Sequence, residues 1–378
     1  MGLYLGLIAA LYLFSLTKGY NRQAVFNFMM FLLALVSGLR YQTGTDYGNF
    51  VGVFRNFISG KKVYTEIGYN FYMYLVNALF GANTLVLYLG QALLIVWSFA
   101  RFIRKNVLKE YWLYAGSLFV TSTIFFQTMN TSRQYVSIAF LLIAFDYGKE
   151  RKMGRFVLFS LIALTFHLSS IICVAVFLFL FLFINKRKDQ DRIMRLLNTL
   201  VLISIILGVI DVRNIFAGAA GLLSRISFFR RFLTYLSSTF FLARNGNSRL
   251  KFIVPNFVWF YIYSHYKRFK QTKKEIPYMD YYFILFAIYL IIENCFSGIN
   301  VFIRIAIQFE VFLLPVIPIC IKSASKANRG LLYIFFLLYF LALTVYSIFL
   351  QGGTGTVPYR CILFYPQNIY LSNYIGLY

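Results

Sequence analysis

The chain has 378 residues, of which 60% are apolar and 13% charged, and its 37 basic residues outnumber 12 acidic ones to give a formal charge of +25. Soluble domains carry about 25% charged residues, and disordered chains are poor in aromatic residues, whereas this chain contains 44 Phe and 30 Tyr. Its apolar runs are continuous, whereas the strands of an outer-membrane barrel alternate apolar and polar residues, so such a barrel is not expected. The composition therefore predicts an all-α polytopic integral membrane protein with a single membrane-embedded domain over 1–378.

Apolar runs long enough to cross or nearly cross a bilayer predict about 12 transmembrane helices. They lie at about 3–17, 24–39, 83–100, 112–127, 134–147, 156–166, 168–184, 196–210, 250–265, 281–296, 300–321 and 330–349. A shorter run at 67–80 contains Asn and Tyr and predicts a re-entrant or interfacial segment. The stretch 156–184 is long for one span, and we expect two short helices that meet at His167.

The basic residues predict the sidedness of the chain. If the N-terminus lies outside, every second loop is cytoplasmic, and these loops hold 23 of the 37 Lys and Arg residues, as the positive-inside rule requires. Both termini and two long outer loops, at about 40–66 and 211–249, then face the exterior. The 211–249 loop has apolar residues spaced by three and four, which predicts an interfacial amphipathic helix; it either lies on the headgroups or forms a lateral gate for a lipid.

The remaining basic residues lie on the outer side, where few carboxylates oppose them. Because a basic outer face is unusual under the same rule, we expect an anionic partner there. The excess of positive charge is thus assigned to the membrane and to this partner, and nucleic acid is not expected.

The first candidate polar group follows the second span and contains Arg40, Asp46 and Tyr47. Gly44, like the glycines at 48 and 52, suits a closely approached backbone. Arg40 and Asp46 either form an ion pair that holds the loop, or Asp46 acts on a sugar hydroxyl, as its base or by positioning it. Glu66 is another candidate base on the outer side, but it lies far in sequence from every other polar cluster and is not favoured for this role.

Two further groups lie on the outer side. Thr131 or Ser132 is a typical N-cap, which puts Arg133 and Gln134 in the first turn of a helix, where free N–H groups and the dipole attract anions. Arg133 either binds phosphate or extends to lipid headgroups. His167 lies amid an apolar run, so it is either a satisfied core residue or a proton acceptor suited to neutral pH.

The last group lies in the 300–321 span. Asn300, Arg304 and Gln308 follow at intervals of four and share one helix face. Buried ionisable residues in membranes are costly and mark functional sites, although a polar packing seam between helices is the alternative. We expect Glu293 to neutralise Arg304.

Three arginines and one histidine on the outer side are typical of a pyrophosphate-binding site. No D-x-D motif, metal-spaced His pair or nucleotide-binding motif is present, so we expect neither a metal nor a cofactor.

At these residues the chain resembles the EpsG and Wzy families of multi-span polysaccharide polymerases. The resemblance rests on short motifs in order along most of the chain, at Arg40, Gly44, Asp46, Tyr47, Glu66, Asn130, Arg133, Gln134, His167, Ser169 and Arg304. It implies a glycosyltransferase type C-like fold in the bacterial inner membrane, with the site facing the periplasm or exterior.

The resemblance also implies a metal-independent glycosyltransferase that joins oligosaccharide repeat units carried on undecaprenyl pyrophosphate. The arginines would bind the leaving pyrophosphate, with help from Gln134, Asn300, Tyr47 and Glu293. His167 would be the base, and Asp46 would position the acceptor. The bilayer and a chain-length regulator protein are the other expected partners.

Three other functions fit the same pattern. An O-antigen ligase would share the topology and the arginines. A flippase or transporter would need helices repeated in sequence, which are not visible. A membrane acyltransferase would use a buried histidine, but its donor is cytoplasmic, opposite to the predicted side of His167.

Overall fold

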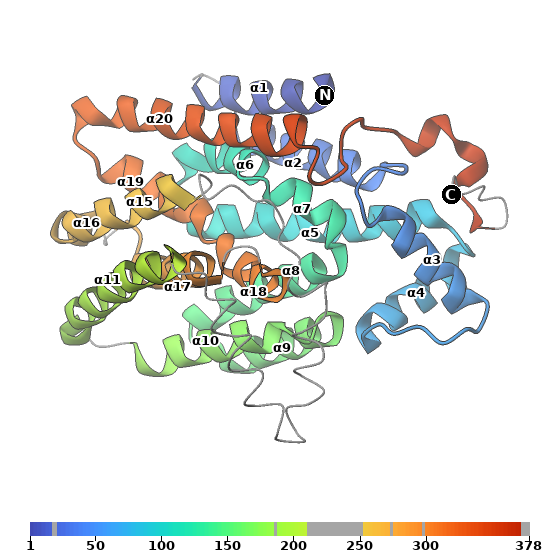
Figure 1. Cartoon of the computed structure of the whole chain (residues 1–378), viewed down its shortest axis with the longest axis horizontal. Coiled ribbons are helices and arrows are strands. Elements are labelled where there is room, and N and C mark those ends of the chain that lie inside the picture. Colours follow the sequence, from blue (N-terminus) through green and yellow to red (C-terminus); the bar gives the residue numbers. More distant parts are fainter. Residues whose placement is uncertain (17–20, 185–186, 210–251, 273–274, 297–298, 372–378) are drawn as a thin grey trace. The chain divides into compact units, whose positions relative to one another are not determined.

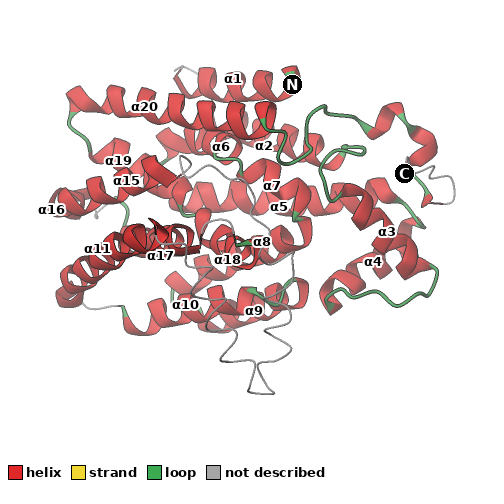
Figure 2. Ribbon diagram, viewed as in Figure 1, coloured by secondary structure: helices red, strands yellow, loops and turns green. Residues whose placement is uncertain are grey.

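The computed structural model describes residues 1–16, 21–184, 187–209, 252–272, 275–296 and 299–371. All regular elements among these residues are helices, joined by turns and short loops (Figures 1 and 2). The chain divides into two compact units, and the boundary between them falls inside helix α10. The first unit comprises residues 1–177 and 325–378, and the second comprises residues 178–324.

The first unit is built around α5, the longest helix in it, which packs against α2, α6, α8 and α4. Helix α9 lies against α8 and α4, and α1 and α20 lie against α6. Its helices are α1 (Gly2–Leu16), α2 (Arg22–Gly38), α3 (Tyr47–Ile58), α4 (Ile67–Phe80), α5 (Thr84–Asn106), α6 (Trp112–Thr121), α7 (Ile124–Asn130), α8 (Ser132–Lys149), α9 (Met153–Phe166), the start of α10 (Ser170–Phe183) and α20 (Lys326–Thr344), which continues as one π-helical turn, Val345–Leu350.

The second unit is centred on α17, which packs against α11, α15, α18 and α19. Two prolines lie in α19, and the pair α18–α19 is bent by 45° at the break between its helices. The helices are α11 (Arg187–Val209), α15 (Ile253–Ser264), α16 (Tyr266–Thr272), α17 (Met279–Phe296), α18 (Asn300–Glu310) and α19 (Leu313–Ser323). The amphipathic helix predicted within 211–249 lies outside the described residues.

Each predicted apolar run coincides with a helix or with a broken pair of helices. Only three helices of the described residues are long and apolar enough to cross a membrane, or four if α18 and α19 form one bent span. The count of about 12 spans is therefore not confirmed. The other apolar helices are short: the 14 residues of α9 extend about 21 Å, less than the roughly 30 Å of a bilayer core. The type C-like fold and the single membrane domain stay predictions.

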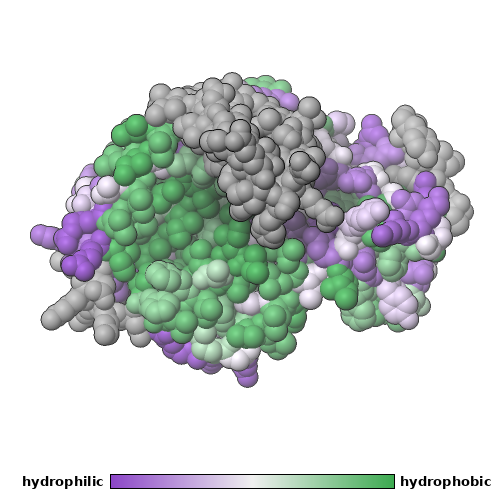
Figure 3. Space-filling model, turned by 60° about the horizontal axis from the view of Figure 1, so that its bottom comes forward, coloured by the Kyte–Doolittle hydropathy of each residue, from purple (hydrophilic) through white to green (hydrophobic). Residues whose placement is uncertain are grey.

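The surface of the described residues is strongly apolar, and Figure 3 shows a broad hydrophobic face. On α9, for example, Val157, Leu158 and Leu161 are each about half exposed. Soluble proteins rarely leave such contiguous apolar patches in contact with water. The apolar surface and the apolar helices together mark a membrane protein.

The segment that follows α20 packs against an N-terminal loop of the first unit. Its backbone pairs with residues 39–45: Gly44 donates to the carbonyl of Gly355 at 2.8 Å, and Tyr41 donates to Arg360 at 2.8 Å. Further along the segment, Leu371 donates to the carbonyl of Ala82. We call residues 351–371 the C-terminal strap.

Candidate functional site

The Glu66 carboxylate joins two of the predicted site residues. Arg133 Nη1 donates to Glu66 Oε2 at 2.8 Å, and His167 Nδ1 lies 3.2 Å from Glu66 Oε1. The three side chains are 30%, 25% and 16% exposed for Arg133, Glu66 and His167. They therefore form a polar cluster at the surface of the first unit that a ligand can reach. Glu66 lies far in sequence from both partners, so the sequence did not predict its contacts with Arg133 and His167.

A close helix contact brings Glu66 to the cluster. Glu66 is the N-cap residue of α4, and its side chain does not cap the helix, because both carboxylate oxygens point to Arg133 and His167. Two residues on, Gly68 packs against α9 so tightly that a Cβ atom there would lie 2.3 Å from Thr165 Oγ1 and 2.9 Å from the Thr165 carbonyl carbon. The missing side chain of Gly68 thus sets how near Glu66 lies to the end of α9.

His167 lies at a break between helices, as predicted. Helix α9 ends at Phe166, His167 has an extended backbone (φ −159°, ψ 112°), and α10 begins at Ser170. Ser137 of α8 donates to the Ala163 carbonyl at 2.7 Å and lies 2.7 Å from the Ser170 hydroxyl. These bonds connect three helices around the break, so the imidazole is held on a rigid support.

Arg133 lies in the first turn of α8, which confirms the predicted helix start at Thr131. The Thr131 hydroxyl donates backwards to the Gln127 carbonyl and does not cap the N–H groups of α8. The guanidinium carbon of Arg133 lies 5.6 Å from the centre of the Tyr69 ring and 5.9 Å from that of Phe50. The two rings hold the guanidinium in place, and the guanidinium and the helix N-terminus together favour an anion at this point.

The environment of Glu66 keeps its carboxylate ionised. Burial raises its pKa, but the hydrogen bond with His167, its own backbone hydrogen bond and the charge of Arg133 together outweigh this, so the pKa lies below its usual value of 4.5. Glu66 is therefore a poor proton acceptor near neutral pH and a good anchor for its two partners.

Arg40 is buried, and its expected ion pair with Asp46 is absent among the described residues. The side chain is 2% exposed and donates to the carbonyl oxygens of Ser37 and Met129. Its guanidinium carbon lies 4.6 Å from the centre of the Tyr88 ring. Arg40 therefore holds the loop through backbone carbonyl groups and an aromatic ring, and not through an ion pair with Asp46.

The other predicted residues of the first unit lie around the cluster in different roles. Tyr47 is buried and stacks on Tyr88 with ring centres 4.5 Å apart. Gln134 is also buried, whereas Asp46 is half-buried at the N-cap position of α3 without capping it. Gly44 has a φ of +103° and meets Asn130, as a closely approached glycine should.

The close approach expected at Gly48 and Gly52 is wrong. No described atom lies within 4 Å of a Cβ built at either position. Both glycines lie on α3 (Tyr47–Ile58), where the helix is open on that side.

Arg304 and Glu293 belong to the second unit. Glu293 is buried near the end of α17, and Arg304 is half-buried on α18, which packs against α17. Asn300 begins α18. Next to Glu293, Asn294 exchanges hydrogen bonds with Asn256 of α15 at 2.9 and 3.0 Å, so these helices share a polar seam.

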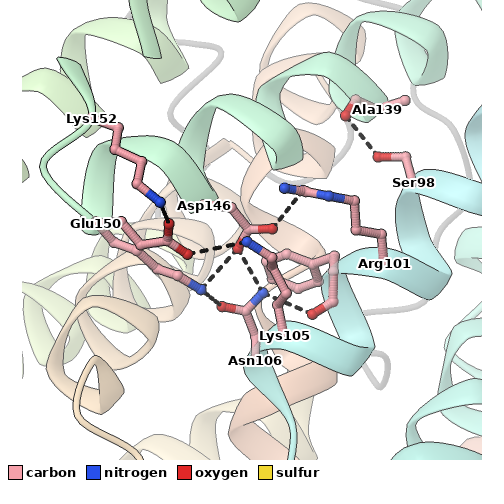
Figure 4. A network of polar contacts seen from close by, with 10 residues as sticks. Ser98, Arg101, Lys105, Asn106, Ala139, Asp146, Glu150 and Lys152 are labelled. Atoms are coloured by element: carbon pink, nitrogen blue, oxygen red, sulfur yellow. Dashed lines mark hydrogen bonds and ion pairs between the residues drawn. The ribbon is translucent and has the colours of Figure 1, made fainter. Parts of the chain in front are cut away.

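A second polar cluster joins α5 and α8 near their C-terminal ends (Figure 4). Asp146 is fully buried and receives Arg101 at 2.7 Å, Lys149 at 2.8 Å and Asn106 at 3.1 Å. Asp146 follows Arg133 by thirteen positions on α8, which corresponds to about 20 Å along the helix axis. Since its acidic member has no exposure, we assign this cluster to helix packing and not to substrate binding.

Among the residues described, no group of three or more His, Cys, Asp and Glu side chains is placed to hold a metal ion. The candidate site in the described part of the first unit is therefore built on Arg133, His167 and the Glu66 carboxylate between them.

The chain was compared with models of known protein families. The model of the EpsG family matches residues 23–361, nearly the whole chain. The chain belongs to the EpsG family. Its membership indicates a membrane protein with a general role in polysaccharide polymerisation. No curated protein and no solved structure matches the chain.

Proposed function

We propose that this EpsG-family protein polymerises lipid-linked oligosaccharide repeat units on the outer side of the bacterial inner membrane. The proposal rests on one observation: Arg133 and His167 both contact the Glu66 carboxylate. A partly exposed guanidinium suits a phosphate leaving group, and an imidazole held by the same carboxylate suits a hydroxyl nucleophile. Both are needed to transfer a sugar from a pyrophosphate to an alcohol.

In the proposed reaction the growing chain leaves its undecaprenyl pyrophosphate carrier. The acceptor hydroxyl of the incoming repeat unit gives its proton to His167 Nε2 as its oxygen bonds to the anomeric carbon. The bond between that carbon and the pyrophosphate oxygen breaks, and its electron pair stays with the pyrophosphate. Arg133 and the N-terminus of α8 stabilise the charge that develops on this leaving group.

Supporting roles are assigned by exposure. Half-buried Asp46 positions the acceptor. In the second unit, Arg304 is the candidate anion ligand, with Asn300 on the same helix and Glu293 on α17. Arg40 and Tyr47 are 2% exposed each, so in this proposal they hold the outer loop and do not touch substrate. Gln134, 3% exposed, likewise supports the first turn of α8.

Deletion of the gene tests the reaction class. A polymerase mutant should still attach single repeat units to the cell surface, whereas a ligase or flippase mutant should attach none, and a gel of surface glycans separates these outcomes. The purified protein in nanodiscs should lengthen a lipid-linked repeat unit, and EDTA should leave the rate unchanged. A deletion strain with glycans of normal length would refute the proposal.

The side of the membrane is tested by cysteine labelling. With the native cysteines replaced, a membrane-impermeant reagent should label Ser59→Cys, in the loop after α3, in intact cells and should not label Lys152→Cys. Both native side chains are exposed, so access to the reagent depends on the side of the membrane. The reverse pattern would place the Glu66 cluster in the cytoplasm and exclude an exterior site.

A further inference from the structure

The contacts of Glu66 divide between its two oxygens. Oε2 accepts from Arg133 and Oε1 faces His167 Nδ1. A carboxylate only accepts hydrogen bonds, so it holds the proton of the imidazole on Nδ1 and leaves the lone pair on Nε2. Among the described residues, neither Nε2 of His167 nor the other N–H groups of Arg133 have a hydrogen-bond partner.

We propose that Glu66 makes the activity of His167 depend on the binding of a pyrophosphate at Arg133. Without a bound pyrophosphate, the Glu66 carboxylate contacts both Arg133 and His167. A bound pyrophosphate takes the guanidinium, and Glu66 then serves His167 alone. This inference rests on the proposed function, and it makes Glu66 a positioning residue that links the donor site to the base.

The competition for Arg133 favours a pyrophosphate. The pair with Glu66 is one hydrogen bond between side chains that are 30% and 25% exposed, and pairs exposed to solvent are worth little. A pyrophosphate carries more charge and offers several oxygens to the fork of the guanidinium. It also accepts from the N–H groups at the start of α8, which a glutamate held at the start of α4 cannot reach.

The released carboxylate then assists proton transfer. When the acceptor hydroxyl gives its proton to Nε2, the imidazole becomes positively charged while Nδ1 keeps its own proton. A carboxylate whose charge is no longer shared with Arg133 stabilises this cation more strongly. The base is thus strengthened only when a donor is present, which disfavours wasteful activation of a hydroxyl or water in the empty site.

The decisive experiment compares Glu66→Gln with the wild-type protein in nanodiscs. Two quantities are measured: the Kd of farnesyl pyrophosphate, used as a short isoprenoid pyrophosphate, and the kcat of repeat-unit transfer. Without its competitor, Arg133 should bind farnesyl pyrophosphate about two- to fivefold more tightly, the equivalent of one exposed ion pair. Without the carboxylate that orients His167, kcat should fall by more than about tenfold, which is part of what general-base catalysis contributes.

A purely structural role for Glu66 predicts a different result, because misfolding would weaken binding and turnover together. That outcome, or an unchanged kcat, would overturn the inference. Glu66→Asp keeps the charge but is too short to reach both partners, so it should also tighten binding; weaker binding by Glu66→Asp would likewise overturn it. Glu150→Gln, which removes an equal charge from a residue paired with Lys105 and Lys152, should match the wild type.

Failure of the proposed function gives a separate signature. If wild type and Arg133→Ala bind farnesyl pyrophosphate equally, Arg133 is no phosphate ligand and both proposals fall. If Arg133→Ala weakens binding but Glu66→Gln does not tighten it, the donor site stands and only the role of Glu66 is refuted.

Discussion

The guanidinium of Arg40 lies 4.6 Å above the centre of the Tyr88 ring, on a side chain that is 2% exposed. Arg133 lies over Tyr69 and Phe50 of the same buried aromatic cluster. The two arginines nevertheless differ in what they can do: Arg40 is enclosed and bonded to carbonyl oxygens, whereas Arg133 is partly exposed and bonded to a carboxylate. Their substitutions should therefore have different consequences.

Arg40→Met should destabilise the protein. It leaves the buried carbonyl oxygens of Ser37 and Met129 without this donor, and each unsatisfied buried group costs about 1–3 kcal/mol. Thermal unfolding in detergent, followed by tryptophan fluorescence, should show a clearly lower Tm. An unchanged Tm would show that the aromatic contact and the two bonds contribute nothing.

Arg133→Ala and Arg304→Ala should abolish polymerisation while the protein still reaches the membrane. A charge-assisted contact is worth about 1.5–3 kcal/mol, which corresponds to roughly ten- to hundredfold in rate. Lysine should not fully restore activity at either position, since it cannot present two forked donors to phosphate. Glycan length on gels reads this out, and wild-type ladders in both alanine variants would end the proposed role of the arginines.

His167→Ala should stop chain growth while binding of farnesyl pyrophosphate survives, because the base is not needed to hold the leaving group. Asp46→Asn should lower kcat less, since the amide still positions an acceptor. Transfer assays and binding measurements on the two purified variants compare these roles. An inactive Asp46→Asn beside an active His167→Ala would reverse the assignment and make the carboxylate the base.

Gly68→Ala should impair polymerisation although Gly68 has no chemistry of its own. The added methyl group would lie 2.3 Å from Thr165 Oγ1, so α4 must move away from α9 and carry Glu66 away from His167. The matched control is Gly48→Ala, a glycine in a helix with no described atom within 4 Å of its Cβ position. Equal activity of the two variants would show that the spacing of α4 and α9 does not matter.

The contribution of the Glu66 pair to stability should persist to mildly acidic pH. Its pKa is depressed below 4.5 in the folded protein, so the stabilisation is fully present above about pH 4.5 and is lost as the pH falls through the lower folded-state pKa. The difference in Tm between wild type and Glu66→Gln, measured from pH 7 to pH 3.5, should persist down to about pH 5 and then shrink. A difference that already disappears between pH 7 and pH 6 would contradict the assigned shift.

Local features of the site could be predicted from the sequence because they depend on neighbours in the chain. An imidazole amid apolar residues indicates a break, and α9 and α10 do meet at His167. Thr131 and Ser132 indicate a helix start, and Arg133 does lie in the first turn of α8.

The role of Glu66 could not be predicted in this way. It depends on the contact between Gly68 and Thr165, residues far apart in sequence whose approach is decided by packing. Of the two alternatives for Arg40 and Asp46, the ion pair is not found among the described residues. The sequence could not decide between them, because the carbonyl acceptors that burial supplies to Arg40 are set by packing. The count of about 12 spans is not confirmed, because apolar runs show where helices lie and do not show how long each one is.

The C-terminal strap has a consequence for how the protein is made. The Asn130 side chain donates to Thr354, and the N–H group of Gly44 donates to Gly355, both of which leave the ribosome only after α20. During insertion into the membrane, Gly44 in the loop that carries Asp46, and Asn130 at the end of α7, therefore lack these acceptors until synthesis has passed α20. Nascent chains arrested before residue 354 should thus expose this loop to proteases, and the polymerase would remain inactive until its strap is in place.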